Sequence, residues 1–436
     1  DCLLSRGLGD VYKRQDINRI ICEQTGDSCN YIKHSSGLEI FVCEMEGFST
    51  TEALFGTKYG SINTCFKTNA DKEFTTVPEG IAHFLEHKLF ENEDCDAFEL
   101  YAKTGANANA YTSFDRTCYL FSCSDNYKES LEILLSFVQN PYFTQETVDK
   151  EQGIIGQEIK MCDDNPTWKV LFNMLQGMYH KHPVRIDIAG TIESIAEIDA
   201  DLLYKCYNTF YNLHNMVLVV AGNVKTEEVI NIADKLLKPC ENQALETVFP
   251  EEPYEIVQKE VYGNLPVGTP IFNVGIKCRP ESGFNRLKSE MECSIAGNII
   301  SDPSAPLYKK LLDEELINST FGFEVFCGDG FFCLIFSGES ADPKKVMQYI
   351  VDEIERVKVE GLDKSLYDSI KKSTYGMIVR ESNNAEAVAG NLISAYMSGV
   401  GPYDSIRILS EMTYNDVQKA LLNRFDTGNM TISVIE

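Results

Sequence analysis

Residues 77–90 read Val77-Pro78-Glu79-Gly80-Ile81-Ala82-His83-Phe84-Leu85-Glu86-His87-Lys88-Leu89-Phe90. Pro78 suits the first turn of a helix, and the apolar residues of the stretch recur at helical spacing. His83 and His87 lie four residues apart, so on a helix both imidazoles leave the same face and can bind one ion. The sequence therefore predicts a helix that presents two histidines and Glu86 on one side.

The residue types of this stretch suit a zinc site. A Zn²⁺ held by two histidines and a carboxylate keeps a fourth position for water, and a nearby Glu can take a proton from that water. His-x-x-Glu-His is the inverted form of the common zinc-protease helix. The alternative is that a five-residue pattern arises by chance in 436 residues, although two of only six histidines fall within it.

A second helix is predicted over residues 144–161, with Thr144 as its N-cap and a carboxylate soon after. Glu151 and Glu158 are seven residues apart, or two turns, so they lie on one face of this helix. The alternative is a pair of solvated carboxylates on an acidic helix. Their position downstream of a two-histidine helix favours a shared site.

With these motifs the chain resembles the insulinase-type (pitrilysin, M16) zinc metallopeptidases, in which His-x-x-Glu-His is followed later by a helix bearing Glu, six residues, then Glu. The resemblance implies that His83, His87 and Glu158 bind one Zn²⁺ per chain. It also implies that Glu86 is the general base and that Glu151 orients a ligand or helps to polarise the water.

A strand segment downstream of the histidines reads Asn109-Ala110-Tyr111-Thr112. Taken alone, it is an ordinary strand with small side chains. In the family that the chain resembles, a matching Asn-Ala-x-Thr segment is the sheet edge that pairs with substrate backbone beside the zinc. The resemblance therefore implies that Asn109, Ala110 and Thr112 bind substrate by β-augmentation, in which main-chain bonds hold an extended peptide whatever its sequence.

The predicted elements occur twice in the same order: strand, helix, strand pair, helices and terminal strand. Residues 16–237 form the first series and residues 254–436 the second, with a polar, proline-rich linker at 238–253. No His follows the linker, so we expect the metal site in the first domain only. We predict an α+β protein of two tandem homologous α/β-sandwich domains, and the resemblance implies the LuxS/MPP-like fold of the insulinase-like metallopeptidases.

Residues 1–15 do not continue into this pattern, and they lack an initiator Met and the apolar core of a signal peptide. We interpret them as a non-native or disordered leader and leave the true N-terminus open. His180 and His182 are two residues apart before a proline, a spacing that does not face one ion from a helix. We expect both to be loop or surface residues.

Composition limits which binding partners and which cellular compartment we expect for this protein. The net charge of −27 argues against nucleic acid and anionic membranes as partners, and no run approaches the roughly 20 apolar residues that span a bilayer. The fifteen Cys include no Cys-x-x-Cys pair. Scattered cysteines of this kind are typical of reduced thiols, so we expect a cytoplasmic protein.

The chain departs from its family in the second half. Active single-chain members carry there an Arg and a Tyr seven residues apart that bind substrate and stabilise the oxyanion, whereas Leu312 and Ser319 stand at these positions here. Loss of one oxyanion donor commonly costs ~3–4 kcal/mol of transition-state stabilisation. By resemblance to heterodimeric members, we expect a homologous partner subunit that supplies the Arg/Tyr pair and closes a chamber, with a homodimer as the other possibility.

We therefore predict a zinc endopeptidase that acts on short or unfolded peptides. Within the family, the chain resembles the bacterial zinc-bearing subunits associated with elongation factor P 5-aminopentanol modification. The alternative is a non-hydrolytic peptide-binding or assembly subunit of a protein-maturation complex, and a third option is a maturation factor with one dedicated protein substrate. Glu86 argues against a non-hydrolytic subunit, because a purely structural metal site has no use for a base.

Overall fold

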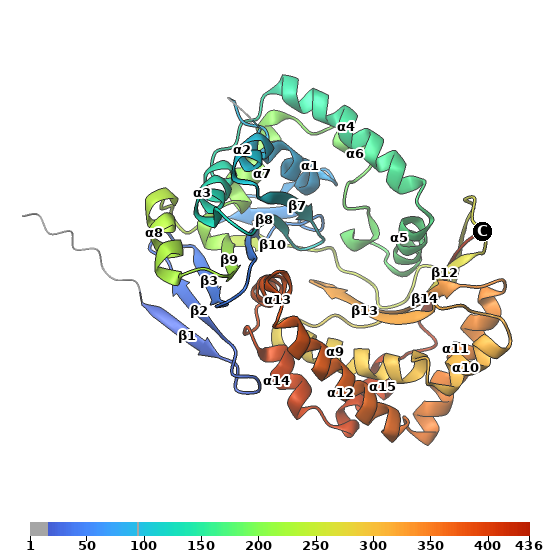
Figure 1. The fold of residues 1–436 in the computed structure, drawn as a ribbon. Helices are drawn as coiled ribbons and strands as arrows, with labels where there is room; N and C mark the ends of the chain where they lie inside the picture. Colours follow the sequence, from blue (N-terminus) through green and yellow to red (C-terminus); the bar gives the residue numbers. More distant parts are fainter. Residues whose placement is uncertain (1–15, 94–95) are drawn as a thin grey trace, which may run out of the picture.

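The computed structural model describes residues 16–93 and 96–436, so the predicted leader lies outside the described residues (Figure 1). The N-terminal half is built on a seven-stranded sheet of order β1-β2-β3-β9-β4-β8-β7. Its strands are β1 (Ile17–Ile21), β2 (Ser28–Lys33), β3 (Glu39–Glu44), β4 (Thr51–Thr57), β7 (Asn107–Thr112), β8 (Thr117–Cys123) and β9 (Met216–Gly222). A small sheet of order β10-β5-β6 lies beside it and contains β5 (Cys65–Thr68), β6 (Thr75–Thr76) and β10 (Leu245–Thr247).

Eight helices of the described residues belong to this half of the sequence. They are α1 (Ile81–Leu89), α2 (Ala97–Thr104), α3 (Tyr127–Val138), α4 (Gln145–Asp163), α5 (Pro166–Met178), α6 (Ile192–Ile195), α7 (Ala200–Phe210) and α8 (Thr226–Leu236). Strand β10 lies within residues 238–253, the segment predicted as a linker, and pairs with β5 of the N-terminal half.

The C-terminal half is built on a five-stranded sheet of order β11-β15-β12-β14-β13. Its strands are β11 (Glu260–Gly263), β12 (Ile271–Lys277), β13 (Gly322–Gly328), β14 (Phe331–Glu339) and β15 (Met430–Ile435). Its helices are α9 (Gly283–Ser301), α10 (Pro306–Asp313), α11 (Pro343–Glu360), α12 (Lys364–Glu381), α13 (Ala385–Met397), α14 (Asp404–Glu411) and α15 (Tyr414–Arg424). Among the described residues, no helix combines the length and apolarity needed to cross a bilayer.

The two large sheets repeat one topology. Strands β3-β9-β4-β8-β7 of the first sheet correspond in order to β11-β15-β12-β14-β13 of the second. In these two series of five strands, the first pair (β3-β9 and β11-β15) is parallel, and each following pair is antiparallel. The predicted α+β fold with a duplicated order of elements is therefore confirmed.

Strand β9 lies at the centre of the first sheet and is buried along its whole length. Because successive side chains of a strand point to opposite faces, Leu218 and Val220 join the core that contains α1, whereas Val217 and Val219 join a second core on the other face. A strand covered on both faces reads as a continuous apolar run, as β9 does.

The halves exchange helices across their sheets (Figure 1). Helix α13 of the C-terminal half packs on β4 and β9, and α5 of the N-terminal half packs on β11, β12 and β15. This contact is close: a Cβ on Gly275 would come within 2.3 Å of Met178 Cε, and one on Gly177 within 2.7 Å of Thr431 Cγ2. Glycine at these two positions leaves room for the side chains of Met178 and Thr431 where α5 packs on the second sheet.

A buried ion pair also joins the halves. The ammonium of Lys277, on β12, donates to Glu252 Oε1 at 2.7 Å, and the backbone N–H groups of His180, Lys181 and His182 donate to the same carboxylate. Burial acts to raise the pKa of Glu252, but these donors outweigh it and lower the pKa to about 2. Glu252 is thus an anion in the segment 238–253 between the halves, and it connects the end of α5 to the second sheet.

Both histidines lie in loop segments, as expected, but only His180 is exposed, whereas His182 is buried. His182 is 1% exposed, and its Nδ1 accepts from the backbone N–H of Val184. Its Nε2 therefore carries the proton and donates to the backbone oxygen of Asp329 at 3.0 Å. Burial lowers the pKa of His182 to about 4, so the imidazole is neutral at pH 7. The sequence gives no sign of this burial because Asp329 lies 147 residues away.

We predict that Glu252→Gln destabilises the protein by about 3 kcal/mol, because it leaves the buried Lys277 without its counter-charge. The measurement is the midpoint of urea unfolding at pH 7. Glu251→Gln is the matched control, since Glu251 is the exposed neighbour. Equal midpoints for the two variants would contradict the role given to the ion pair.

We predict that the buried His182 contributes a loss of stability as the pH falls from 6.5 to about 4, against the opposite contribution of Glu52, whose pKa is raised to about 7. The folded pKa of His182 lies below its ordinary value of 6.5, so the unfolded chain binds the proton first and protonation favours unfolding. Glu252 acts in the same direction between pH 4.5 and about 2. Unfolding midpoints measured against pH should show a shallower decline between pH 6.5 and 4 in His182→Gln, and an unchanged decline would contradict the assignment.

Candidate active site

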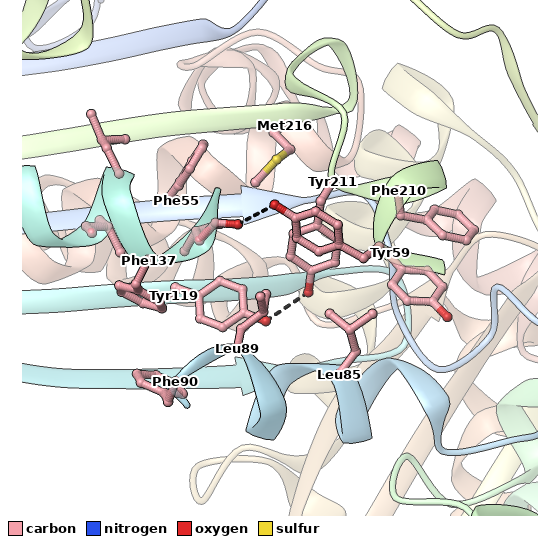
Figure 2. Close-up of a cluster of buried hydrophobic side chains, with 14 of the residues drawn as sticks. Phe55, Tyr59, Leu85, Leu89, Phe90, Tyr119, Phe137, Phe210, Tyr211 and Met216 are labelled. Atoms are coloured by element: carbon pink, nitrogen blue, oxygen red, sulfur yellow. Dashed lines mark hydrogen bonds between the residues drawn. The ribbon is translucent and has the colours of Figure 1, made fainter. Parts of the chain in front are cut away.

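Helix α1 is the element that carries the histidines, and it is buried on nearly all sides. The predicted helix is confirmed. Leu85 and Leu89 of α1 pack into an aromatic core, in which the hydroxyls of Tyr119 and Tyr211 are 2.8 Å apart (Figure 2). The chain enters α1 through Gly80 at φ 87°, where a Cβ would come within 2.3 Å of the backbone oxygen of Ala189. The helix is thereby fixed in position before its first histidine.

Helix α4 brings the two carboxylates to α1. It begins as predicted at Thr144, whose side chain accepts from the backbone N–H of Thr147 in a capping box. Val148, Ile155 and Ile159 are buried in the core and hold one face of α4 against the domain. Helices α1 and α4 pack together, and the neighbouring face of α4 turns its carboxylates toward the histidines.

The structure brings together the three residues predicted as metal ligands. Glu158 Oε1 is 3.6 Å from His83 Nε2, and Glu158 Oε2 is 3.5 Å from His87 Nε2. One donor atom from each residue lies within 4.8 Å of the other two. A tetrahedral Zn²⁺ with bonds of about 2.0–2.1 Å requires ligand atoms about 3.4 Å apart. The donor types and their spacing therefore fit zinc.

Glu151 fixes the ring of His87. Its Oε1 lies 3.0 Å from His87 Nδ1, and a carboxylate can only accept, so His87 Nδ1 carries the proton and Nε2 keeps a lone pair for a metal. Among the described residues, the buried Nδ1 of His83 has no hydrogen-bond partner. The two predicted ligand histidines are thus held differently, because Glu151 binds the Nδ1 of His87 and no side chain binds that of His83 among the described residues.

The directions of the pKa shifts in this cluster indicate that it favours positive charge. Burial alone would lower the pKa of His87, but the hydrogen bond with Glu151 and the neighbouring carboxylates outweigh it and raise the pKa. The interaction with His83 is the main cause that holds the pKa of Glu158 below its usual range. Burial acts to raise the pKa of Glu151, but the bond to His87 lowers it overall. A divalent cation can supply the charge that these groups favour.

Glu86 lies on α1 between the histidines and is only 8% exposed. Its Oε2 accepts a hydrogen bond of 2.7 Å from Thr112 Oγ1. Glu86 and His87 line a cavity of about 590 Å³, together with Asn109 and Ala110 of β7. The carboxylate thus faces a space large enough for a peptide side chain, beside the possible metal position.

Strand β7 is the last strand in the order of its sheet, as the predicted substrate edge requires. Asn109 and Ala110 line the cavity, whereas Thr112 turns its hydroxyl to Glu86. The substrate-binding role of these residues stays a prediction. Sequence reasoning missed Phe98 and Ile154, which are 48% and 49% exposed and also line the cavity, because an exposed apolar residue gives no signal of its surroundings.

The positions at which the family has an Arg and a Tyr lie away from this cavity. Leu312 is 47% exposed on α10, and Ser319 is exposed before β13. Neither residue lines the cavity beside Glu86. The described part of the chain therefore offers no oxyanion donor from these two positions.

Comparison with known proteins places this architecture in a family. Residues 75–192 match the sequence model described as Insulinase (Peptidase family M16), and residues 197–374 match the one described as Peptidase M16 inactive domain. The uncharacterized zinc protease YmfH of Bacillus subtilis is 37% identical over 421 residues, which cover 95% of this chain and 98% of YmfH.

Solved structures agree. The crystal structure of an M16-like peptidase from Alicyclobacillus acidocaldarius superposes with a TM-score of 0.90 at 31% identity, covering 97% of this chain and 98% of that one. Pitrilysin shows the same fold, with a TM-score of 0.76 at 15% identity, covering 97% of this chain and 47% of pitrilysin.

The matched family model and the curated relatives are those of zinc metallopeptidases. The chain belongs to the insulinase (M16) family of that class, which confirms the resemblance seen in the sequence. Residues 197–374 match the inactive domain of the family, in agreement with the absence of His after the segment 238–253.

We predict that Glu151→Gln weakens zinc binding by about 10- to 100-fold, because an amide orients the ring of His87 less firmly than a carboxylate does. The dissociation constant is measured by competition with a chromophoric chelator. Glu146→Gln, an exposed change in the first turn of the same helix, should leave it unchanged. Equal constants for wild type and Glu151→Gln would show that Glu151 has no part in the site.

Proposed function

We propose that this chain is a zinc-dependent endopeptidase that hydrolyses short or unfolded peptides in an enclosed chamber, with a partner subunit that supplies an Arg/Tyr pair. The observation that carries the proposal is the convergence of His83, His87 and Glu158 at donor spacing, with Glu86 beside them at the wall of a cavity. Curated relatives named zinc proteases support the peptidase class.

His83, His87 and Glu158 would hold one Zn²⁺ per chain. When bound, the ion would supply a Lewis acid for the scissile carbonyl and lower the pKa of the attacking water. Glu86 takes a proton from that water and returns it to the leaving amine. General acid–base catalysis of this kind contributes roughly 10²- to 10⁴-fold in rate. Glu151 keeps the ring of His87 in the orientation that leaves Nε2 free.

The edge of β7 would bind the substrate. It borders the cavity through Asn109 and Ala110, and its free side offers main-chain groups to an extended peptide. Pairing of this kind reads backbone rather than side chains, so it suits short or unfolded peptides and excludes folded proteins. Specific side chains would then enter the cavity beside Glu86.

A partner subunit follows from the missing donors. Leu312 offers no hydrogen bond, and Ser319 lies in an exposed turn away from the cavity. The chain has the length of 47% of pitrilysin, so a second chain of the same fold would complete an assembly of pitrilysin's size. A heterodimer with an Arg/Tyr-bearing homologue satisfies both points, and a homodimer satisfies only the second.

The second candidate is a non-hydrolytic peptide-binding or assembly subunit of a protein-maturation complex, which the absence of the Arg/Tyr pair favours. The position of Glu86 between the histidines favours the peptidase instead, because a purely structural metal site has no use for a base. The association with elongation factor P modification rests on sequence resemblance alone. We further propose a cytoplasmic location, which the thirteen free thiols of the described residues support.

The test of the proposed function is Glu86→Gln in the full chain co-expressed with a family member that carries the Arg/Tyr pair. We expect zinc binding to persist and cleavage of a quenched fluorogenic peptide library to fall at least about 100-fold, because the proton acceptor is lost. Glu99→Gln, an exposed change on α2, is the control.

Each other outcome contradicts one part of the proposal. Wild-type rates in Glu86→Gln would remove its role as base. Full activity of the wild-type chain alone would remove the need for a partner. Zinc binding without cleavage, with or without the partner, would favour the binding subunit.

A further inference from the structure

The hydroxyl of Thr112 holds the carboxylate of Glu86 from the side of the sheet. Thr112 Oγ1 lies 2.7 Å from Glu86 Oε2, and this is the only hydrogen bond that the carboxylate receives from the described residues. A carboxylate can only accept, so the Thr112 hydroxyl donates. Oε1 of Glu86 receives no hydrogen bond from the described residues, so it is free to accept one from a water in the cavity that Glu86 lines.

Thr112 lies at the end of a row of threonines across three strands. It lies directly opposite Thr117 on β8, and Thr117 lies opposite Thr57 on β4, so the three side chains share the face of the sheet that packs on α1. Thr112 Oγ1 and Thr117 Oγ1 are 3.3 Å apart, but each hydroxyl donates its one proton elsewhere, so this contact is packing rather than a hydrogen bond. Thr117 and Thr57 are fully buried.

The row ends on backbone oxygens, which give it a fixed geometry. Thr117 Oγ1 donates to the backbone oxygen of Tyr59 at 2.9 Å, and Thr57 Oγ1 donates to that of Phe210 at 2.6 Å. Threonine has few allowed χ1 rotamers, and here the sheet and these bonds select among them. The hydroxyl of Thr112 is thus delivered to Glu86 from a rigid surface rather than from a loop.

This arrangement gives Thr112 a different part from its neighbours on β7. Asn109 and Ala110 line the cavity, whereas Thr112 does not. From these contacts, and on the basis of the proposed peptidase function, we infer that Thr112 is a positioning residue for the general base Glu86. It fixes Oε2 so that Oε1 points to the water that attacks the peptide.

The inference also connects substrate binding to the base. Thr112 is the last residue of β7, the strand whose free edge we propose to bind peptide backbone. A peptide that pairs with β7 would restrain the same strand that holds Glu86. The base would therefore be best ordered when the edge is occupied by substrate.

The test compares Thr112→Val, which removes the hydroxyl at nearly constant volume, with Thr112→Ser, which keeps it. Both are made in the zinc-loaded full chain with the Arg/Tyr-bearing partner. We expect kcat to fall about tenfold in Thr112→Val, as partial loss of base catalysis requires, with KM and the zinc dissociation constant within about twofold of wild type. Thr112→Ser should restore kcat to within about threefold.

The matched control is Thr374→Val on α12, whose hydroxyl donates to a helix carbonyl in the other half. A wild-type kcat in Thr112→Val would overturn the inference. A Thr112→Ser variant as slow as Thr112→Val would also overturn it, because the loss would then follow from the methyl group or the backbone. A parallel loss of zinc affinity in Thr112→Val would do the same.

Crystal structures of the two variants give a readout that does not depend on activity. We expect the Glu86 carboxylate to leave its position in Thr112→Val and to keep it in Thr112→Ser. An unmoved carboxylate in Thr112→Val would overturn the inference even if the wild type cleaves peptides. If the wild-type complex cleaves no peptide, the proposed function fails, and the position of the carboxylate still decides whether Thr112 holds Glu86.

Discussion

The packing of α1 against α4 is the contact on which the site depends. It sets two imidazoles against two carboxylates of α4, with Glu86 on the inner side, and most of these groups are at least partly withdrawn from water. Unpaired charges in such a place would be costly, so each must have a partner or a cation. Glu151 pairs with His87, and Thr112 pairs with Glu86. Glu158 faces both histidines at 3.5–3.6 Å, where we propose that a metal binds.

The rest of the fold keeps that contact in register. Leu85 and Leu89 anchor α1 in an aromatic core (Figure 2), and Thr112 of β7 binds the carboxylate of Glu86. The second half carries no metal-binding histidine, yet its helix α13 covers the outer face of β4 and β9. A half that matches an inactive domain is therefore part of the support of the active one.

The sequence predicted those features that depend on local spacing. The histidines four residues apart, the carboxylates seven apart and the N-cap at Thr144 each follow from helix geometry, and a resemblance to one family assembled them into a site. The repeated order of elements predicted the fold in the same way. Glu86 was identified because it lies inside the motif.

The features that sequence reasoning missed depend on contacts between distant segments. His182 lies in a loop, as expected, but nothing in the sequence indicated that it is buried against a turn of the other half. Thr112 was read as a substrate contact, and nothing in Asn109-Ala110-Tyr111-Thr112 shows that its hydroxyl meets a carboxylate 26 residues earlier. The packing of α5 and α13 on the sheet of the opposite half could not be predicted either, because the pattern of an amphipathic helix does not indicate which sheet the helix covers.

X-ray absorption at the zinc edge of the metal-loaded chain tests the central claim most directly, since it reports the ligands without requiring activity. The account predicts a four-coordinate ion with two imidazole nitrogens and the remaining ligands oxygen, all at about 2.0–2.1 Å. The histidine signal should fall when either His83 or His87 is replaced by Ala, and it should be lost when both are replaced. Sulfur at about 2.3 Å, or a spectrum unchanged by those substitutions, would contradict it and place the zinc elsewhere.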